Sequence, residues 1–106
     1  MHKSTGKATL KVPLETIDNY VARRSLNRLD FIKIDVEGAE HLVFRGALKT
    51  LKRLRPAIIF ERNPESCENV VETLRATDYS FLDLQEKPLG QNIQQWPTNI
   101  LAVSRA

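Results

Sequence analysis

One ten-residue stretch, FIKIDVEGAE at positions 31–40, constrains the fold more than any other part of the chain. Its β-branched apolar residues alternate with Lys33 and then Asp35, which is typical of a strand in a largely covered sheet. Gly38 permits a tight reversal of the backbone, and a helical pattern follows. In open α/β sheets, ligands lie beyond the carboxyl ends of the strands. The stretch therefore predicts a central strand that brings Asp35 and Glu37 to the edge where a ligand would bind.

A strand–helix–strand unit follows from the pattern around this stretch. Apolar residues spaced along one helix face predict a single helix over residues 39–54. Pro56 ends it, because the residue before a proline is pushed out of the helical region. The apolar run 57–60 then predicts a strand covered on both faces and ending at Glu61. Two parallel strands joined through a helix form a right-handed unit, so Glu61 should lie at the same sheet edge as Asp35.

The residues before this unit predict an edge strand and a short helix. Residues 8–17 alternate between apolar and polar side chains, as a half-buried strand does. Pro13 cannot donate a ladder hydrogen bond, so this strand belongs at the edge of a sheet. Thr16 or Asp18 can cap the helix that follows. Residues 1–7 lie outside any pattern, and we expect them to be disordered.

The residues after the unit predict one more helix and two strands. The helix spans 65–76, with Ser66 or Asn63 as its cap, and the strands span 79–84 and 99–104. The segment between these strands has no helical period, although a parallel crossover normally needs a helix. The last strand should therefore return antiparallel in a wide hairpin. We expect an α/β fold with a mostly parallel sheet and an antiparallel terminal hairpin.

The composition narrows the class of function. At 106 residues the chain forms one domain at most and is short for a complete α/β enzyme. No secretory signal or apolar run of about 18 residues is present, so we expect no membrane span and a cytoplasmic location. Cys67 is the single cysteine, which excludes an internal disulfide and a multi-cysteine metal site. A polar-surface or packing role is favoured over a nucleophilic one. The net charge of +3 does not by itself imply nucleic acid.

Several longer stretches carry the pattern of a known family. They are VPLETIDNY at 12–20, FIKIDVEGAE at 31–40, LVFRGA at 42–47, and the Arg55-Pro56 pair ahead of a strand ending in Glu61. In these stretches the chain resembles the FkbM family of S-adenosylmethionine-dependent methyltransferases over nearly its whole length. The resemblance implies a Rossmann-like class I methyltransferase fold, of which residues 1–106 are the C-terminal part.

The resemblance also implies a half of the fold that the chain does not contain. Such enzymes begin with a strand leading into a glycine-rich loop, whereas the four glycines here form no such array. We therefore expect this chain to supply one wall of the S-adenosylmethionine site, with Asp35 as a cofactor-binding residue, and to bind no cofactor alone. The edge of the 31–36 strand would allow self-association unless residues 8–17 cover it.

The implied reaction is methylation of a hydroxyl group on a small-molecule, sugar or lipid-linked acceptor. A carboxylate at the end of a central strand can remove the hydroxyl proton, directly or through a divalent ion. Asp35 is the first candidate for this role, and Glu37 and Glu61 are further catalytic candidates. The structural alternatives are helix-terminus stabilisation by Glu37 or Glu40. For Glu61 the alternative is an ion pair with Arg62 or Arg45. Trp96 and the loop before it can shape an acceptor pocket or anchor a solvent-facing loop.

Two other functions fit the same residues. A chain without the glycine-rich half can be a non-catalytic remnant that acts as an interaction module. A basic helix end could instead bind nucleic acid, although the helix macrodipole explains this clustering better. That helix end consists of Arg45, Lys49, Lys52, Arg53 and Arg55. A glycine-rich loop encoded upstream would favour the enzyme, and salt-dependent binding of an oligonucleotide would favour the third function.

Overall fold

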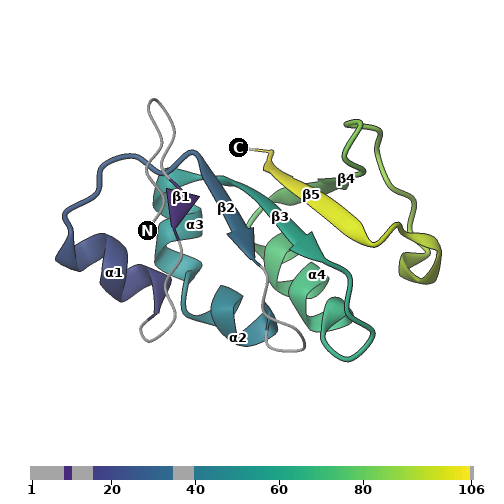
Figure 1. Ribbon diagram of the computed structural model, residues 1–106, viewed down its shortest axis with the longest axis horizontal. Coiled ribbons are helices and arrows are strands. Elements are labelled where there is room, and N and C mark those ends of the chain that lie inside the picture. Colours follow the sequence, from purple (N-terminus) through teal and green to yellow (C-terminus); the bar gives the residue numbers. More distant parts are fainter. Residues whose placement is uncertain (1–8, 11–15, 35–39, 106) are drawn as a thin grey trace.

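A five-stranded sheet with helices packed against one face makes up the fold (Figure 1). The computed structural model describes residues 9–10, 16–34 and 40–105, so the expected disorder of residues 1–7 lies outside the described residues. Within these ranges no helix is long and apolar enough to cross a bilayer. In chain order the elements are β1 (Thr9–Leu10), α1 (Ile17–Arg23), β2 (Phe31–Ile34), α2 (Glu40–Arg45), α3 (Leu48–Leu54), β3 (Ala57–Glu61), α4 (Cys67–Ala76), β4 (Tyr79–Leu82), the 3-10 helix η1 (Ile93–Gln95) and β5 (Asn99–Ser104).

The sheet is mixed, with strand order β1-β2-β3-β5-β4. β1 pairs with β2, and β2 with β3, in parallel, whereas β5 is antiparallel to both of its neighbours. The expectation of a mostly parallel sheet is therefore wrong, because the last strand inserts between β3 and β4 and makes both of its pairings antiparallel. The α/β class and the antiparallel terminal hairpin are confirmed. β1 also covers the edge of β2, as the sequence allowed.

One face of the sheet is buried, and the other is only partly covered. Side chains alternate along β2, β3, β4 and β5 between the two faces. Those on the buried face pack with the helices in one core, where the rings of Phe44 and Phe60 meet edge to face at 5.8 Å. The expectation that residues 57–60 are covered on both faces is wrong. Ile59 is only half-buried, because α2, α3 and α4 lie on the same side of the sheet (Figure 1).

The helix predicted over residues 39–54 is two helices, α2 and α3, separated by Gly46 and Ala47. A Cβ on Gly46 would lie 2.9 Å from the Cβ and Cγ2 atoms of Thr16, so only glycine fits this close approach. The carbonyl of Gly46 also accepts the N–H of Asp18 at 2.9 Å. Contact with the start of α1 therefore breaks a helix that the apolar period alone would continue.

Asp18 also caps the second of these helices from a distance. Ala47, at the N-cap position of α3, makes no side-chain capping bond. The carboxylate of Asp18 instead accepts the N–H of Lys49 at 3.1 Å and the N–H and hydroxyl of Thr50, each at 2.8 Å. Thr16 caps α1 by accepting the N–H of Asn19, as the sequence predicted. The two candidate caps thus serve two different helices.

Replacing Gly46 by Ala should lower the free energy of unfolding by about 1–3 kcal/mol, because the new methyl group overlaps Thr16. Urea denaturation measures the change. Gly90→Ala is the matched control, since a Cβ there meets no atom within 4 Å. Thr16→Ser removes Cγ2 and should restore part of the loss in the double variant. Equal stability of the two glycine variants would contradict the close packing of Gly46 against Thr16.

At the opposite end of the sheet, Arg55 holds the last turn of α3 to the strands. It ends the helix in the left-handed region, with φ 53°. Its guanidinium lies 4.8 Å from the centre of the Tyr79 ring, a cation–π contact. The same group donates to the hydroxyl of Ser104 and to the carbonyls of Leu51 and Asp78. Arg53 likewise donates to the carbonyl of Leu26. Two cations of the basic helix end therefore serve the fold itself.

Alkaline pH should destabilise the fold through Tyr79. Burial raises the pKa of Tyr79 to about 12, against the opposing charge of Arg55, and its hydroxyl donates to the carbonyl of Pro56 at 2.6 Å. A raised folded-state pKa means that this stabilisation is complete below about pH 10 and is lost as the pH rises towards about 12. Between about pH 10 and 12, the free energy of unfolding of the wild type should fall by about 2–3 kcal/mol more than that of Tyr79→Phe. Urea unfolding measured at successive pH values tests this, and parallel curves would contradict it.

Candidate functional site

The carboxyl ends of β2 and β3 lie side by side and define the candidate site. Their parallel pairing sets Ile34 opposite Phe60, so the residues that follow each strand share one edge of the sheet. Glu61 is the last residue of β3. Asp35 and Glu37 follow β2 in the sequence but lie outside the described residues. Their catalytic roles, and the cofactor-binding role of Asp35, stay predictions.

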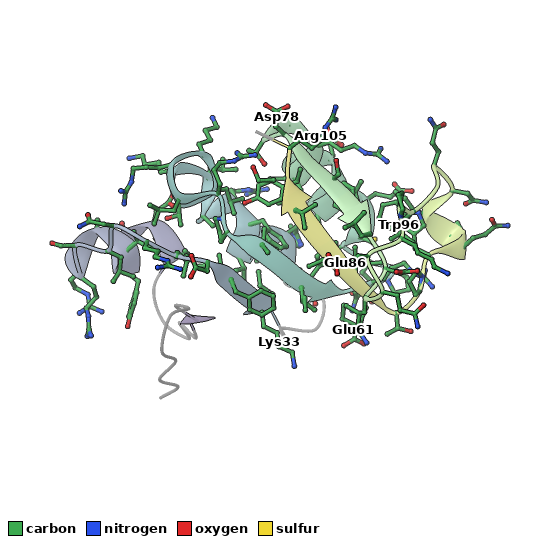
Figure 2. All side chains as sticks on the ribbon, turned by 90° about the horizontal axis from the view of Figure 1, so that it is seen from above. Lys33, Glu61, Asp78, Glu86, Trp96 and Arg105 are labelled. Carbon is green, nitrogen blue, oxygen red and sulfur yellow. The ribbon has the colours of Figure 1, made fainter. Side chains whose placement is uncertain are left out.

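Glu61 is half-buried at this edge and is paired with Asn99 of β5. It lies on the less covered face of the sheet, as does Lys33, and Figure 2 shows both at the same end of the strands. Within the described part of the chain, neither side chain forms an ion pair, and the alternative pairing of Glu61 with Arg62 or Arg45 is not observed. The carboxylate of Glu61 can therefore receive a hydrogen bond or a proton from a ligand.

A buried hydrogen bond joins the two helices that begin at this edge. Glu40, the first residue of α2, and Ser66, just before α4, are each 1% exposed. The hydroxyl of Ser66 donates to Oε1 of Glu40 at 3.0 Å. Ser66 holds the N-cap position without capping the helix, and Asn63 instead accepts the N–H of Glu65. Glu40 thus lies in the first turn of α2, as expected, and also ties the start of this helix to α4.

Cys67, Arg62 and His41 lie around the same helix ends. The Cys67 thiol is 3% exposed, and burial raises its pKa while Arg62 lowers it and Glu68 and Glu40 raise it further. A thiol that stays protonated is a weak nucleophile. Of the two non-nucleophilic roles predicted, its burial supports packing and not a polar surface. Among the described residues, Nδ1 of His41 and Nε of Arg62 are buried and find no hydrogen-bond partner. No sequence signal marked these two atoms.

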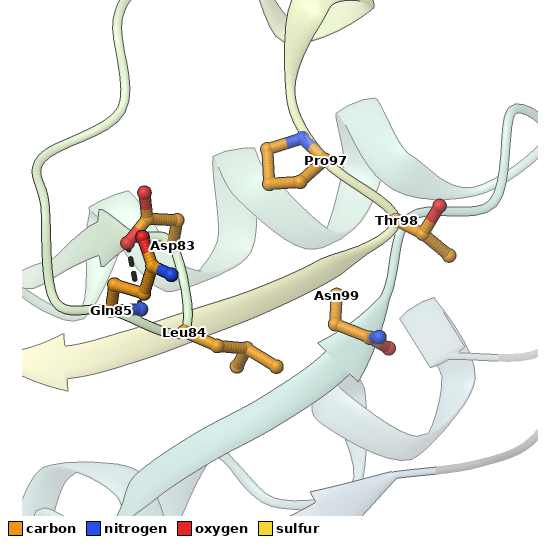
Figure 3. A pocket seen from close by; sticks show the side chains of 6 residues that line it. All are labelled: Asp83, Leu84, Gln85, Pro97, Thr98 and Asn99. Carbon is orange, nitrogen blue, oxygen red and sulfur yellow. Dashed lines mark hydrogen bonds between the residues drawn. The ribbon is translucent and has the colours of Figure 1, made fainter.

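An open hollow of about 330 Å³ lies next to this edge, between the end of β4 and the start of β5 (Figure 3). Its residues combine apolar and polar groups: Asp83, Leu84, Gln85, Pro97, Thr98 and Asn99. Asp83 accepts the N–H groups of Gln85 and Lys87 at 2.8 and 2.9 Å, which fixes the turn. Leu84 is 53% exposed, and Asn99 connects the hollow to Glu61. A ligand with an apolar part and hydroxyl groups matches this lining.

Trp96 is not among the residues that line the hollow. Its side chain is 4% exposed, and its ring packs on Phe81 with centroids 5.2 Å apart. Its indole N–H donates to the carbonyl of Gly90 at 2.8 Å. Of the two roles proposed from the sequence, anchoring of the loop is the one that the structure confirms.

The described residues do not form a cradle for S-adenosylmethionine. The space beside Gly46 is filled by Thr16, and Gly90 faces open space, so neither glycine sits against a built cavity. Gly6 and Gly38 lie outside the described residues. Over residues 16–34 and 40–105, no three histidine, cysteine, aspartate or glutamate side chains gather as metal ligands.

Comparison with known proteins gives a match to one protein family. A family model described as a methyltransferase FkbM domain matches residues 1–81. No curated protein and no solved structure matches the chain. The matched residues include the paired ends of β2 and β3 and the buried bond between Glu40 and Ser66. The hollow lies beyond the matched residues, at positions 83–99.

Proposed function

Because the chain belongs to the FkbM methyltransferase family, we propose that it forms the acceptor side of an S-adenosylmethionine-dependent methyltransferase acting on a hydroxyl group. The observation that supports this most is the edge shared by β2 and β3 within the matched region. Glu61 ends one of these strands, and Asp35 follows the other in the sequence. Carboxylates at adjacent strand ends are suited to the proton chemistry of a hydroxyl acceptor.

The proposed role of these carboxylates is to bind and deprotonate the acceptor. A hydroxyl group that gains a methyl group must lose its proton, and a carboxylate within hydrogen-bond reach can accept it. We assign this proton to Asp35, and the orientation of the hydroxyl to Glu37 and Glu61. Glu61 suits an orienting role because it is half-buried and makes no ion pair with another described residue.

The hollow beside Asn99 supports an acceptor that is part apolar and part hydroxylated. Leu84 and Pro97 offer carbon surface, while Asn99 and Thr98 offer hydrogen-bonding groups. A small molecule, a sugar or a lipid-linked glycan head group has this mixed character. Because Asn99 pairs with Glu61, an acceptor in the hollow would lie next to the proposed carboxylates.

Calorimetric titration with S-adenosylhomocysteine tests the proposal in two proteins. The first is this chain, which should give no heat of binding, because its described residues form no glycine cradle. The second is a chimera in which the glycine-rich half of another FkbM methyltransferase precedes this chain, and it should bind. Heat from the chain alone would show that the cofactor site is elsewhere than proposed. A folded chimera that gives no heat would favour the non-catalytic interaction module.

A further inference from the structure

The less covered face of the sheet carries an apolar patch with one charge of each sign at its rim. This open face consists of Phe31, Lys33, Ala57, Ile59, Glu61, Ser80, Leu82, Asn99, Leu101 and Val103. Lys33 and Asn99 are exposed and the other members are half-buried. The view in Figure 2 looks onto the strands from this side, with no helix in front of β2, β3 or β5.

Such a face is unusual for the parallel part of a sheet. Parallel strands are normally covered on both sides, whereas β1, β2 and β3 are covered by helices on one side (Figure 1). Four strands about 4.8 Å apart, with three rows of side chains about 7 Å apart, give a patch of roughly 400 Å². This patch is about half of the roughly 800 Å² that each partner buries in a standard interface.

We propose that the open face is an interface between two copies of this chain related by a two-fold axis. The charges at its rim are self-complementary. Lys33 and Glu61 form no ion pair with any described residue, and they lie on neighbouring strands of the same face. A two-fold axis sets the same surface against itself, so Lys33 of one copy can face Glu61 of the second copy, twice.

The strand register supports this arrangement. Lys33, Ile59, Leu101 and Leu82 stand in one row across β2, β3, β5 and β4, and Glu61 stands one row nearer the carboxyl edge. On a regular sheet, a two-fold axis midway between Lys33 and Glu61 passes close to Ile59 and Leu101. Strands of the two copies then cross nearly at right angles, one of the two common arrangements of packed sheets. In the same arrangement that forms both charge pairs, Ile59 and Leu101 of one copy therefore face Ile59 and Leu101 of the second copy.

This dimer does not depend on methyl transfer, but it uses the carboxylate of Glu61 that the proposed function assigns to the acceptor hydroxyl, so the charge pair and an acceptor at Glu61 compete. The dimer also borders the proposed acceptor hollow. Asn99 belongs both to the open face and to the lining of the hollow. A second copy on the open face would therefore cover one side of the hollow.

Sedimentation of the full chain over a wide range of concentration tests the proposal. The wild type should show a concentration-dependent dimer whose Kd rises with salt, since the charge pairs lie at the rim. Lys33→Glu and Glu61→Lys should each raise the Kd by about tenfold to a hundredfold, because each sets like charges against each other. An equimolar mixture of these two variants should restore the dimer, because each then meets the opposite charge. Ile59→Lys should abolish it.

The charge reversal Lys52→Glu is the matched control, because Lys52 is exposed on α3, away from the open face. Its Kd should equal that of the wild type, and circular dichroism should show every variant folded. A chain that stays monomeric at the highest concentration overturns the proposal and leaves the open face to an occupant other than a second copy. A dimer that tolerates Ile59→Lys, or single variants whose mixture restores nothing, overturns it as well.

Discussion

Asp35→Asn should reduce methyl transfer by about 10²–10⁴-fold in the chimera that carries a complete cofactor half, the range that general base catalysis contributes. Asparagine keeps the size and a hydrogen-bonding oxygen but cannot accept the hydroxyl proton. The measurement is transfer of a tritium-labelled methyl group from S-adenosylmethionine to the hydroxyl-bearing small molecules and lipids of a cell extract. The melting temperature should be nearly unchanged, because the exchange preserves shape.

Two further variants separate proton removal from other roles of a carboxylate at this edge. Glu61→Gln should weaken turnover by only about tenfold if this residue orients the acceptor, since a glutamine oxygen still accepts a hydrogen bond. Glu72→Gln is the control, because Glu72 is exposed on α4 away from the edge. Unaltered turnover of the Asp35 variant would remove its assigned role. A larger loss of turnover in Glu61→Gln than in Asp35→Asn would assign proton removal to Glu61 and orientation of the acceptor to Asp35.

Much of the sheet could be predicted from the sequence because its strands have strong local signals. The alternation through β2, the apolar run of β3 and the length of residues 85–98 predicted these strands and the closing hairpin in nearly the observed places. The mostly parallel expectation was wrong because strand order is a tertiary property. No residue of β5 encodes the fact that it enters between β3 and β4. Likewise, apolarity on both sides of β3 indicates a need for cover but not which layer supplies it.

Two features, one of the fold and one of the candidate site, had no local signal. The break between α2 and α3 depends on Thr16 and Asp18, about thirty residues earlier in the chain, which press against Gly46 and cap the second helix. Glu40 was predicted as a residue that stabilises a helix terminus, and its partner Ser66 as a cap. The hydrogen bond between them joins residues that are 26 positions apart. Neither the pattern of a helix-terminus charge nor that of an N-cap predicts such a pair. Contacts at this separation are set by how the helices pack on the sheet, so local pattern cannot show them.

Ser66→Ala should lower the free energy of unfolding by about 2–3 kcal/mol, since it leaves a buried carboxylate without its hydroxyl donor. Glu40 is 1% exposed, so water cannot replace that donor without opening the contact between α2 and α4. Ser80→Ala is the control, because Ser80 is half-buried on the open face and makes no side-chain hydrogen bond to a described residue. Urea denaturation of both variants measures the difference.

A double-mutant cycle separates the bond itself from the loss of packing. In Glu40→Met with Ser66→Ala, two apolar side chains of similar volume replace the buried polar pair, and the cost should fall to within about 1 kcal/mol of the wild type. If the losses of unfolding free energy in Glu40→Met and in Ser66→Ala instead add up in the double variant, the bond has no coupling energy. The two helices are then held by packing alone. If the two losses couple as expected, the bond between Glu40 and Ser66 fixes the start of α2. Residues 35–39 connect that start to β2 in the sequence. Because they include Asp35, which is predicted to act on the acceptor and to bind the cofactor, Ser66→Ala in the chimera should then also slow methyl transfer and weaken the binding of S-adenosylhomocysteine.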